Sequence, residues 1–281
     1  MARPKIFRFK IIHYYLIPLV ALVVWWGMLI AMLSAWYIQG QPRYWFMTHD
    51  DRPVYISDIG ATSLQPLFIS CTGFQAIFFV STLIVEHILR KQGKLQPYTS
   101  TKQPILSYIS IFWAIIGQLG ILFVSIFNTN SFKNVHLTMV GIFIAGCFFA
   151  CLFNFFITFI FGFYPVRLTP TNEHVIFGKH RWANVYMLSF FMKICWLFAA
   201  LAFALCFGIY MKLKQRSLSS IFEWTISFFY GLLLVMWSMD LFPAAIKAYN
   251  KLYPHYLYEK NDESSDIPAS YDTPEQIRYQ Y

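Results

Sequence analysis

Residues 14–37 read YYLIPLVALVVWWGMLIAMLSAWY and contain no charged side chain. A helix needs about 20 apolar residues to cross the roughly 30 Å hydrocarbon core of a bilayer, and this run is long enough. The basic segment before it, MARPKIFRFK, is typical of a signal-peptide start, but the apolar run is too long for one and lacks a cleavage site of small residues. We therefore predict a transmembrane helix that the protein retains.

Five further apolar runs of similar length follow, at residues 66–89, 106–127, 135–163, 183–211 and 221–242. The chain of 281 residues is 58% hydrophobic and 12% charged, whereas soluble domains contain about 25% charged residues. The sequence therefore predicts an all-α polytopic membrane protein in which residues 14–243 form a bundle of six transmembrane helices. The connections are too short to hold a soluble catalytic domain.

The distribution of Lys and Arg predicts which side of the membrane each connection faces, because cytosolic loops carry an excess of cations. Most of the 22 Lys and Arg residues fall in the N-terminus, in the second and fourth connections and after the last span. We therefore expect residues 1–13 to be a basic cytosolic N-terminus, residues 38–65 an exoplasmic loop, and residues 244–281 a cytosolic juxtamembrane segment with a disordered tail. The stretch MKLKQR at 211–216 conflicts with this topology, since it places cations on the outer side.

The juxtamembrane cations are also candidates for contacts with anionic lipid head groups, each worth about 1 kcal/mol near the membrane surface. These candidates are Arg3, Lys5, Arg8, Lys10, Arg90, Lys91 and Lys94. Membrane topology thus accounts for the net charge of +9, and we expect no nucleic-acid partner.

The predicted outer loop ends in VYISDIGATSLQPLF, residues 54–68. Thr62 followed by Gln65 matches a capping box, in which each side chain bonds to the backbone N–H of the other residue, and Pro66 suits a first helical turn. We therefore expect ATSLQP to begin the second span. The preceding YISDIG suits a tight turn at its Asp-Gly end, but a turn does not require the residues before that pair.

Ionisable side chains within or beside a span are functional candidates because charge is costly there. We expect Glu86, His87 and His136 to lie at the membrane interfaces, close to span ends. Lys193 lies deeper, and snorkelling of its long side chain to the cytosolic side is favoured over a binding role. Glu223 and Asp240 are about 25 Å apart along one helix, too far to act as a paired acid and base.

No pattern typical of hydrolases, phosphate-binding loops or zinc peptidases occurs, so we predict a non-enzymatic protein without a metal or a cofactor. The five Cys residues fall within predicted spans, and Cys147 and Cys151 have no nearby His or carboxylate in the sequence, so neither an exoplasmic disulfide nor a metal site is expected. Small residues in the fourth span predict close packing against another helix. They are Gly141, Ala145, Gly146 and Ala150.

The chain resembles the six-span family of the damage-regulated autophagy modulators (DRAM proteins) and their FRAG and SFK relatives. Three segments carry this resemblance: VYISDIGATSLQPLF at 54–68, VHLTMVGIF at 135–143, and SIFEWTISFFYGLLLVMWSMDLF at 220–242. It covers about residues 14–242 and is greatest to the fungal branch, the suppressors of phosphatidylinositol four-kinase mutants. The family pattern marks as candidate functional residues Tyr55, Ile56, Ser57, Asp58, Gly60, His136, Gly141, Glu223, Trp224 and Asp240.

Three of these polar residues should lie at the same membrane depth, at the exoplasmic ends of their spans. We therefore expect Asp58, His136 and Glu223 to form a polar network in which a protonated His136 lies between two carboxylates.

The resemblance implies a non-enzymatic regulator at the plasma membrane, which supports a cytosolic phosphatidylinositol 4-kinase complex, maintains phosphatidylinositol 4-phosphate and influences phospholipid asymmetry between leaflets. The expected partners are membrane lipids and this lipid-kinase complex, with the tail as the preferred docking segment, and the oligomeric state is open. Two alternatives remain. One is an autophagy modulator of the vacuole, lysosome or another endomembrane. The other handles lipids or remodels lipid anchors directly, which a groove open to the bilayer and lined by Lys193 or Glu223 would favour.

Overall fold

The computed structural model describes residues 13–47, 51–168 and 180–252, and almost all of its regular structure is helical. Six helices are long and apolar enough to cross a membrane, which confirms the predicted all-α polytopic fold. They are α1 (Leu16–Ile38), α3 (Gln65–Lys91), α4 (Lys102–Ile126), α5 (Lys133–Phe163), α6 (Val185–Lys212) and α7 (Arg216–Leu252). Two short helices, α2 (Ile56–Ile59) and η1 (Pro165–Arg167), lie in the connections. The predicted lipid contacts at Arg3, Lys5, Arg8 and Lys10 and most of the predicted tail lie outside the described residues.

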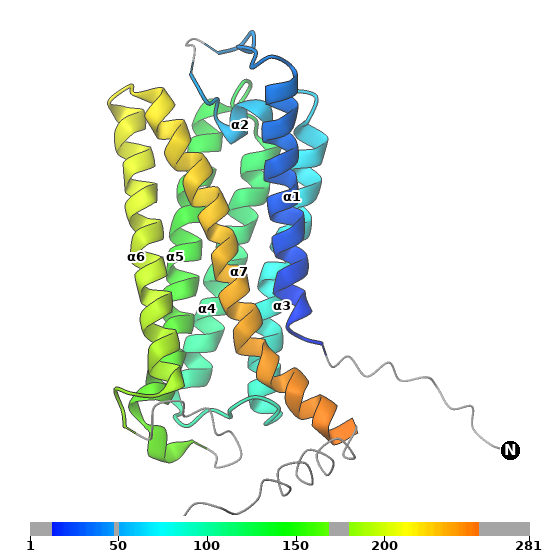
Figure 1. The fold of residues 1–281 in the computed structure, drawn as a ribbon. Coiled ribbons are helices and arrows are strands. Elements are labelled where there is room, and N and C mark those ends of the chain that lie inside the picture. Colours follow the sequence, from blue (N-terminus) through cyan, green and yellow to red (C-terminus); the bar gives the residue numbers. More distant parts are fainter. Residues whose placement is uncertain (1–12, 48–50, 169–179, 253–281) are drawn as a thin grey trace, which may run out of the picture.

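The six spans form a closed ring with up-and-down topology (Figure 1). Each span packs against the next one in sequence, and α7 returns to pack against α1. Two indole groups join this last seam: Trp25 Nε1 donates to the carbonyl of Ser227 at 2.7 Å, and Trp26 Nε1 donates to that of Phe228 at 3.0 Å. The first and last spans are therefore held together directly.

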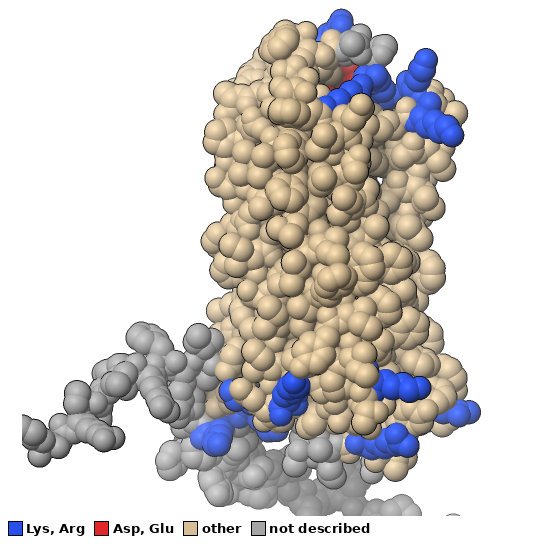
Figure 2. Space-filling model, turned by 180° about the vertical axis from the view of Figure 1, so that it is seen from behind, with Lys and Arg blue, Asp and Glu red and all other residues tan. Residues whose placement is uncertain are grey.

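The even number of spans places both described ends of the bundle, at Leu16 and Leu252, on the same side (Figure 1). We call this end the terminal face, and the opposite end, which carries α2, the loop face. Figure 2 shows Lys and Arg side chains gathered at the two faces, with a wide band free of charge between them. A band of this kind matches the hydrocarbon core of a bilayer.

Helix α7 continues beyond the end that the sequence predicts. We expected the last span to finish at Phe242, but the helix runs through Pro243 to Leu252. In this extension Ala244 is buried in an apolar cluster with Leu89 of α3. This packing stabilises the extra turns and offsets the hydrogen bond that Pro243 cannot donate.

Helices α4 and α5 approach each other closely at a pair of glycines. A Cβ atom added to Gly146 would lie 2.5 Å from the Cα of Gly117, so only glycine fits at this crossing. Ala150, one turn along α5, is also buried, whereas Gly141 and Ala145 are exposed. The predicted close packing is confirmed for Gly146 and Ala150 and is wrong for Gly141 and Ala145.

The centre of the bundle is an aromatic core. The rings of Phe79 and Tyr230 stack at 5.8 Å, and Trp237 packs edge-on to Phe79 at 4.8 Å. The Tyr230 hydroxyl accepts hydrogen bonds from the side-chain amides of Gln75 and Gln118, so this buried polar atom is satisfied. Because Tyr230 and Trp237 lie between Glu223 and Asp240 along α7, the core separates two polar clusters, one toward each face.

Candidate functional site

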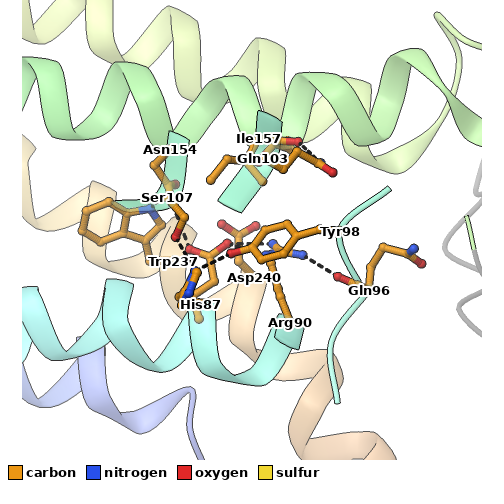
Figure 3. Close-up of polar contacts among 12 residues, drawn as sticks. His87, Arg90, Gln96, Tyr98, Gln103, Ser107, Asn154, Ile157, Trp237 and Asp240 are labelled. Atoms are coloured by element: carbon orange, nitrogen blue, oxygen red, sulfur yellow. Dashed lines mark hydrogen bonds and ion pairs between the residues drawn. The ribbon is translucent and has the colours of Figure 1, made fainter. Parts of the chain in front are cut away.

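Toward the terminal face, charged side chains from several helices meet inside the bundle (Figure 3). Arg90 donates from Nε and Nη2 to Glu86 Oε1, at 2.9 and 2.7 Å, one turn apart on α3. The second carboxylate oxygen of Glu86 accepts from Asn154 Nδ2 of α5 at 2.9 Å, and Asn154 Oδ1 accepts from Trp237 Nε1 of α7 at 3.1 Å. This chain of contacts connects three spans.

A second ion pair lies nearby and adds α6 to the group. Lys193 Nζ lies 2.5 Å from Asp240 Oδ2 of α7 and donates to Thr158 Oγ1 of α5 at 3.3 Å. We call Glu86, Arg90, Asn154, Lys193 and Asp240 the ion cluster. It contains two acids and two bases, so its formal charges cancel, as buried charges require.

The connection between α3 and α4 covers the ion cluster from the terminal face. Arg90 Nη1 donates to the carbonyl of Gln96, while His87 Nδ1 lies 2.9 Å from the Tyr98 hydroxyl and 3.0 Å from Ser107 Oγ. Burial raises the pKa of Tyr98 to about 12, so its hydroxyl stays protonated. Gln103 anchors the same connection by accepting from the backbone N–H of Thr99 and Ser100.

The ion cluster corrects several predictions from the sequence. Glu86 and His87 lie near the end of α3, but they point into the bundle, and each is 6% exposed. Arg90 is not a lipid contact, because its guanidinium is buried against Glu86 and above the ring of Phe161. Lys193 does not snorkel: at 2% exposure it is buried beside Asp240. For Arg90 and Lys193 an acidic partner makes burial of the charge tolerable.

The remaining predicted lipid contacts within the described residues are at the surface of the terminal face. Lys91 Nζ contacts the Tyr108 hydroxyl at 2.6 Å, and Lys94 Nζ contacts that of Tyr14 at 3.4 Å. A cation beside an aromatic ring is a common arrangement at membrane interfaces. Lipid contact by Lys91 and Lys94 stays a prediction.

Toward the loop face, the YISDIG segment docks on the first turns of α7. The Glu223 carboxylate accepts from the backbone N–H of Ile56 at 2.7 Å and lies 3.5 Å from Ser57 Oγ. Trp224 Nε1 donates to the carbonyl of Val54 at 2.9 Å. Tyr55 is buried and packs edge-on against Phe207 of α6. The segment is therefore not a free loop, and its residues close the bundle at this face.

Asp58 lies in α2 at the same face, separate from the Glu223 contacts. Its Oδ1 accepts from Thr129 Oγ1, in the connection between α4 and α5, at 3.1 Å. Burial raises the pKa of Asp58 to about 6, although the hydrogen bond from Thr129 acts in the opposite direction. Nearby, a Cβ added to Gly60 would clash with the ring of Phe68, which explains the glycine at the end of the motif. We call Ile56, Ser57, Asp58, Thr129 and Glu223 the loop-face cluster.

The predicted network of Asp58, His136 and Glu223 does not form, since each of the three bonds to other residues. His136 is buried, but its Nδ1 lies 3.0 Å from the carbonyl of Val124 and 2.8 Å from that of Phe127, not between carboxylates. The last carbonyls of a helix have no partner within the helix, so those at the end of α4 attract this donor. His136 therefore caps α4.

The predicted capping box does not form. Thr62 Oγ1 donates to the carbonyl of Ile59, and Gln65 Nε2 reaches across to the carbonyls of Ser125 and Ile126 at the end of α4. Pro66 lies in the first turn of α3, as predicted. The polar side chains before α3 thus satisfy the end of a neighbouring helix instead of their own.

The sequence did not indicate some residues of these clusters. Asn154, Trp237 and Thr158 belong to apolar runs, and the partnership of Glu86 with Arg90 was not foreseen. An Asn in the middle of a Phe-rich span was the available signal, because an unpaired amide is costly in hydrocarbon. Within the described residues, no three His, Cys, Asp or Glu side chains come together as metal ligands.

The raised pKa of Asp58 predicts a pH-dependent stability. The pKa of Asp58 is about 6 in the folded protein, against 3.8 for a free aspartate side chain, so folding favours the protonated form. The contribution of Asp58 to the free energy of unfolding is fully present below pH 3.8 and is lost as pH rises through 6. We expect Asp58→Asn to raise the free energy of unfolding at pH 7 by on the order of 1 kcal/mol, with allowance for partial solvent exposure.

The measurement is thermal unfolding of the purified protein in detergent between pH 4 and pH 7. The difference between wild type and Asp58→Asn should grow with pH across this range. Thr129→Val removes the opposing hydrogen bond and should widen the pH-dependent loss. A constant difference at all pH values would contradict the assignment.

Comparison with known proteins gives the wider relationship. Residues 13–244 match the family described as the Frag1/DRAM/Sfk1/Cwh43P N-terminal domain. Protein SFK1 of Saccharomyces cerevisiae is 31% identical, over 88% of this chain and 85% of the relative. Protein sfk1 of Schizosaccharomyces pombe is 25% identical, over 97% of this chain and 75% of the relative. No solved structure matches the chain. The chain therefore belongs to the Frag1/DRAM/Sfk1 family of multi-pass membrane proteins.

Proposed function

We propose that this protein is a non-enzymatic regulator in the plasma membrane, which supports phosphatidylinositol 4-kinase signalling and the organisation of phospholipids between leaflets. The observation that carries the proposal is the terminal face, where exposed cations stand beside aromatic rings. These cations border the surface band that is free of charge (Figure 2). Such a surface suits an anionic leaflet and a cytosolic partner that works on anionic lipids.

The proposal requires the terminal face to be cytosolic. Support comes from the cations in the connections at this face, together with those of the N-terminal and C-terminal segments. The segment after Leu252, which is outside the described residues, is the proposed docking element for that complex.

A non-enzymatic role fits the chemistry of both polar clusters. In the ion cluster each charged group faces an opposite charge or an amide, and these contacts hold the spans together. In the loop-face cluster, Glu223 receives backbone N–H donors of α2. These contacts give both clusters a structural role.

The proposal is tested by measuring phosphatidylinositol 4-phosphate at the plasma membrane of a fungal host with a fluorescent sensor. Deletion of the gene should lower the sensor signal, and wild type should restore it. Truncation after Leu252 and the double variant Lys91→Ala, Lys94→Ala should each lose most of this rescue. The matched control is Lys133→Ala with Lys212→Ala, which removes two exposed cations from the loop face and should rescue fully.

Two outcomes would contradict the proposal. An unchanged sensor signal after deletion, with the protein on vacuolar or other internal membranes, would favour the autophagy alternative. Equal rescue by the two double variants would remove the terminal face as the working surface. Surface expression of each variant is measured in parallel, so that loss of protein is not mistaken for loss of function.

A further inference from the structure

A cavity of about 130 Å³ lies inside the half of the bundle that is nearer the loop face. It is bounded mainly by α5, α6 and α7 and is covered by α2 at the loop face. Its volume is roughly ten times what one water-sized sphere requires. The space arises because α6 presents the small side chains of Ala200 and Ala204 there, opposite larger side chains such as Phe143.

The shape and lining of the cavity fit a hydrocarbon chain. Along α7 its lining extends from Glu223 to Leu233, which corresponds to about 15 Å of helix. A similar length of α6, from Trp196 to Phe207, forms the opposite wall. The walls between these ends are almost entirely apolar, so water has few partners inside. A long, narrow and apolar space is suited to an acyl chain.

Helix α6 is the wall between this cavity and the lipid. It is the least buried of the six spans, so little protein separates the cavity from the bilayer. A membrane lipid is therefore the nearest abundant source of a hydrocarbon chain. A water-soluble ligand would have to pass α2, which is pinned to α7 by the contact between Ile56 and Glu223.

The polar end of the cavity offers a hydrogen-bond acceptor. Glu223 is part of the lining, and of its two oxygens Oε2 accepts from Ile56 N–H at 2.7 Å. Oε1 lies 3.5 Å from Ser57 Oγ, and the backbone N–H of Ser57 also donates to the carboxylate. A carboxylate has about four acceptor positions. Within the described part of the chain, no Lys or Arg forms a salt bridge with Glu223. The carboxylate therefore has capacity for a further donor.

We propose that this cavity binds the acyl chain of a membrane lipid whose head group donates hydrogen bonds to Glu223. An ammonium or a hydroxyl head group supplies such donors, whereas a trimethylammonium head group has none. The site is thus expected to prefer phosphatidylethanolamine to phosphatidylcholine with the same acyl chains.

The test uses the purified full chain in detergent micelles, with a trace of phosphatidylethanolamine that carries a photoactivatable group on its acyl chain. After irradiation, mass spectrometry identifies the labelled residues. We expect labelling in the cavity walls of α5, α6 and α7. Excess unlabelled phosphatidylethanolamine should remove the labelling, and the same amount of phosphatidylcholine should leave most of it. Competition by diacylglycerol would show that a hydroxyl donor is sufficient, which also supports the proposal.

Two variants on α6 form a matched pair. Ala204→Phe fills the cavity and should lower labelling about tenfold, or 1.4 kcal/mol of binding. Ala202→Phe makes the same change on the exposed side of the helix and should label like wild type. Glu223→Leu removes the hydrogen-bond acceptor and should abolish the preference between the two phospholipids. Thermal unfolding of each variant controls for misfolding, and the competition on wild type does not depend on any variant.

Labelling that both phospholipids compete for equally would overturn the assigned role of Glu223. Labelling spread over the lipid-facing surface, and equal in the two phenylalanine variants, would overturn the site itself. Neither result bears on kinase regulation, because binding is measured on purified protein. The lipid site and the proposed function can therefore fail separately.

Discussion

Lys193→Met is expected to lower the free energy of unfolding by about 3 kcal/mol, the lower end for a buried pair, because it leaves the partly buried Asp240 without its cation. Lys193 is 2% exposed, so water cannot replace the lost partner from the side of α6. Methionine has a similar length and little polarity, and the packing around Phe155 and Thr158 should therefore survive. The effect thus reports on the charge and not on a cavity.

The measurement is unfolding of the purified protein in mixed micelles, followed by tryptophan fluorescence. The double variant Lys193→Met, Asp240→Leu removes both charges and should recover most of the lost stability, since replacing a buried pair by apolar side chains is often neutral. Lys212→Met, an exposed lysine at the end of the same helix, is the control and should cost little. If Lys193→Met were as mild as this control, the ion pair would not be a structural element.

Gly146→Leu is expected to cost about 3 kcal/mol, at the upper end of the range for overpacking. The added side chain would meet the backbone of Gly117 on α4, and backbone cannot move aside by changing a rotamer. Separation of α4 from α5 would also stretch the hydrogen bond from Ser110 Oγ to the carbonyl of Ala150, which is 2.7 Å long. The change should therefore loosen the whole α4–α5 seam.

The control is Gly141→Leu, the same substitution on the same helix. A Cβ at Gly141 meets nothing within 4 Å, and leucine favours a helix more than glycine does, so this variant should be neutral or slightly stabilising. Opposite signs for the two variants in the same unfolding assay are the expected result. Equal losses would mean that Gly141, which belongs to the family motif, has a packing role that this structure does not give it.

The sequence predicted the spans well and the polar contacts poorly, for a physical reason. The length of an apolar run is a local property, and Leu16–Ile38 or Gln65–Lys91 can be recognised without knowing their neighbours. Apart from the pair Glu86 and Arg90, one turn apart on α3, the partners of these buried charges are not local. Glu86 bonds to Asn154, and Lys193 to Asp240, across distances in sequence that no periodicity reveals.

The loop-face motif shows the same limit. The sequence predicts a helix start after VYISDIG, because Pro66 suits a first turn. It does not predict the bond from Ile56 N–H to Glu223 or the contact of Gln65 with the end of α4, because both depend on how the ring of helices closes. The sequence correctly indicates that His136 is a polar residue at a span end. Its contact with the α4 carbonyls, and not with the carboxylates, depends on the tertiary structure.

The seam between α1 and α7 also constrains how the protein can be made. During synthesis the first span enters the membrane before the last span has been made. The indole N–H groups of Trp25 and Trp26 therefore have no acceptors until the carbonyls of Ser227 and Phe228 have been synthesised. Until then these donors are exposed to lipid or to an insertion chaperone. Assembly of the ring is therefore a late event that only a chain containing all six spans can complete.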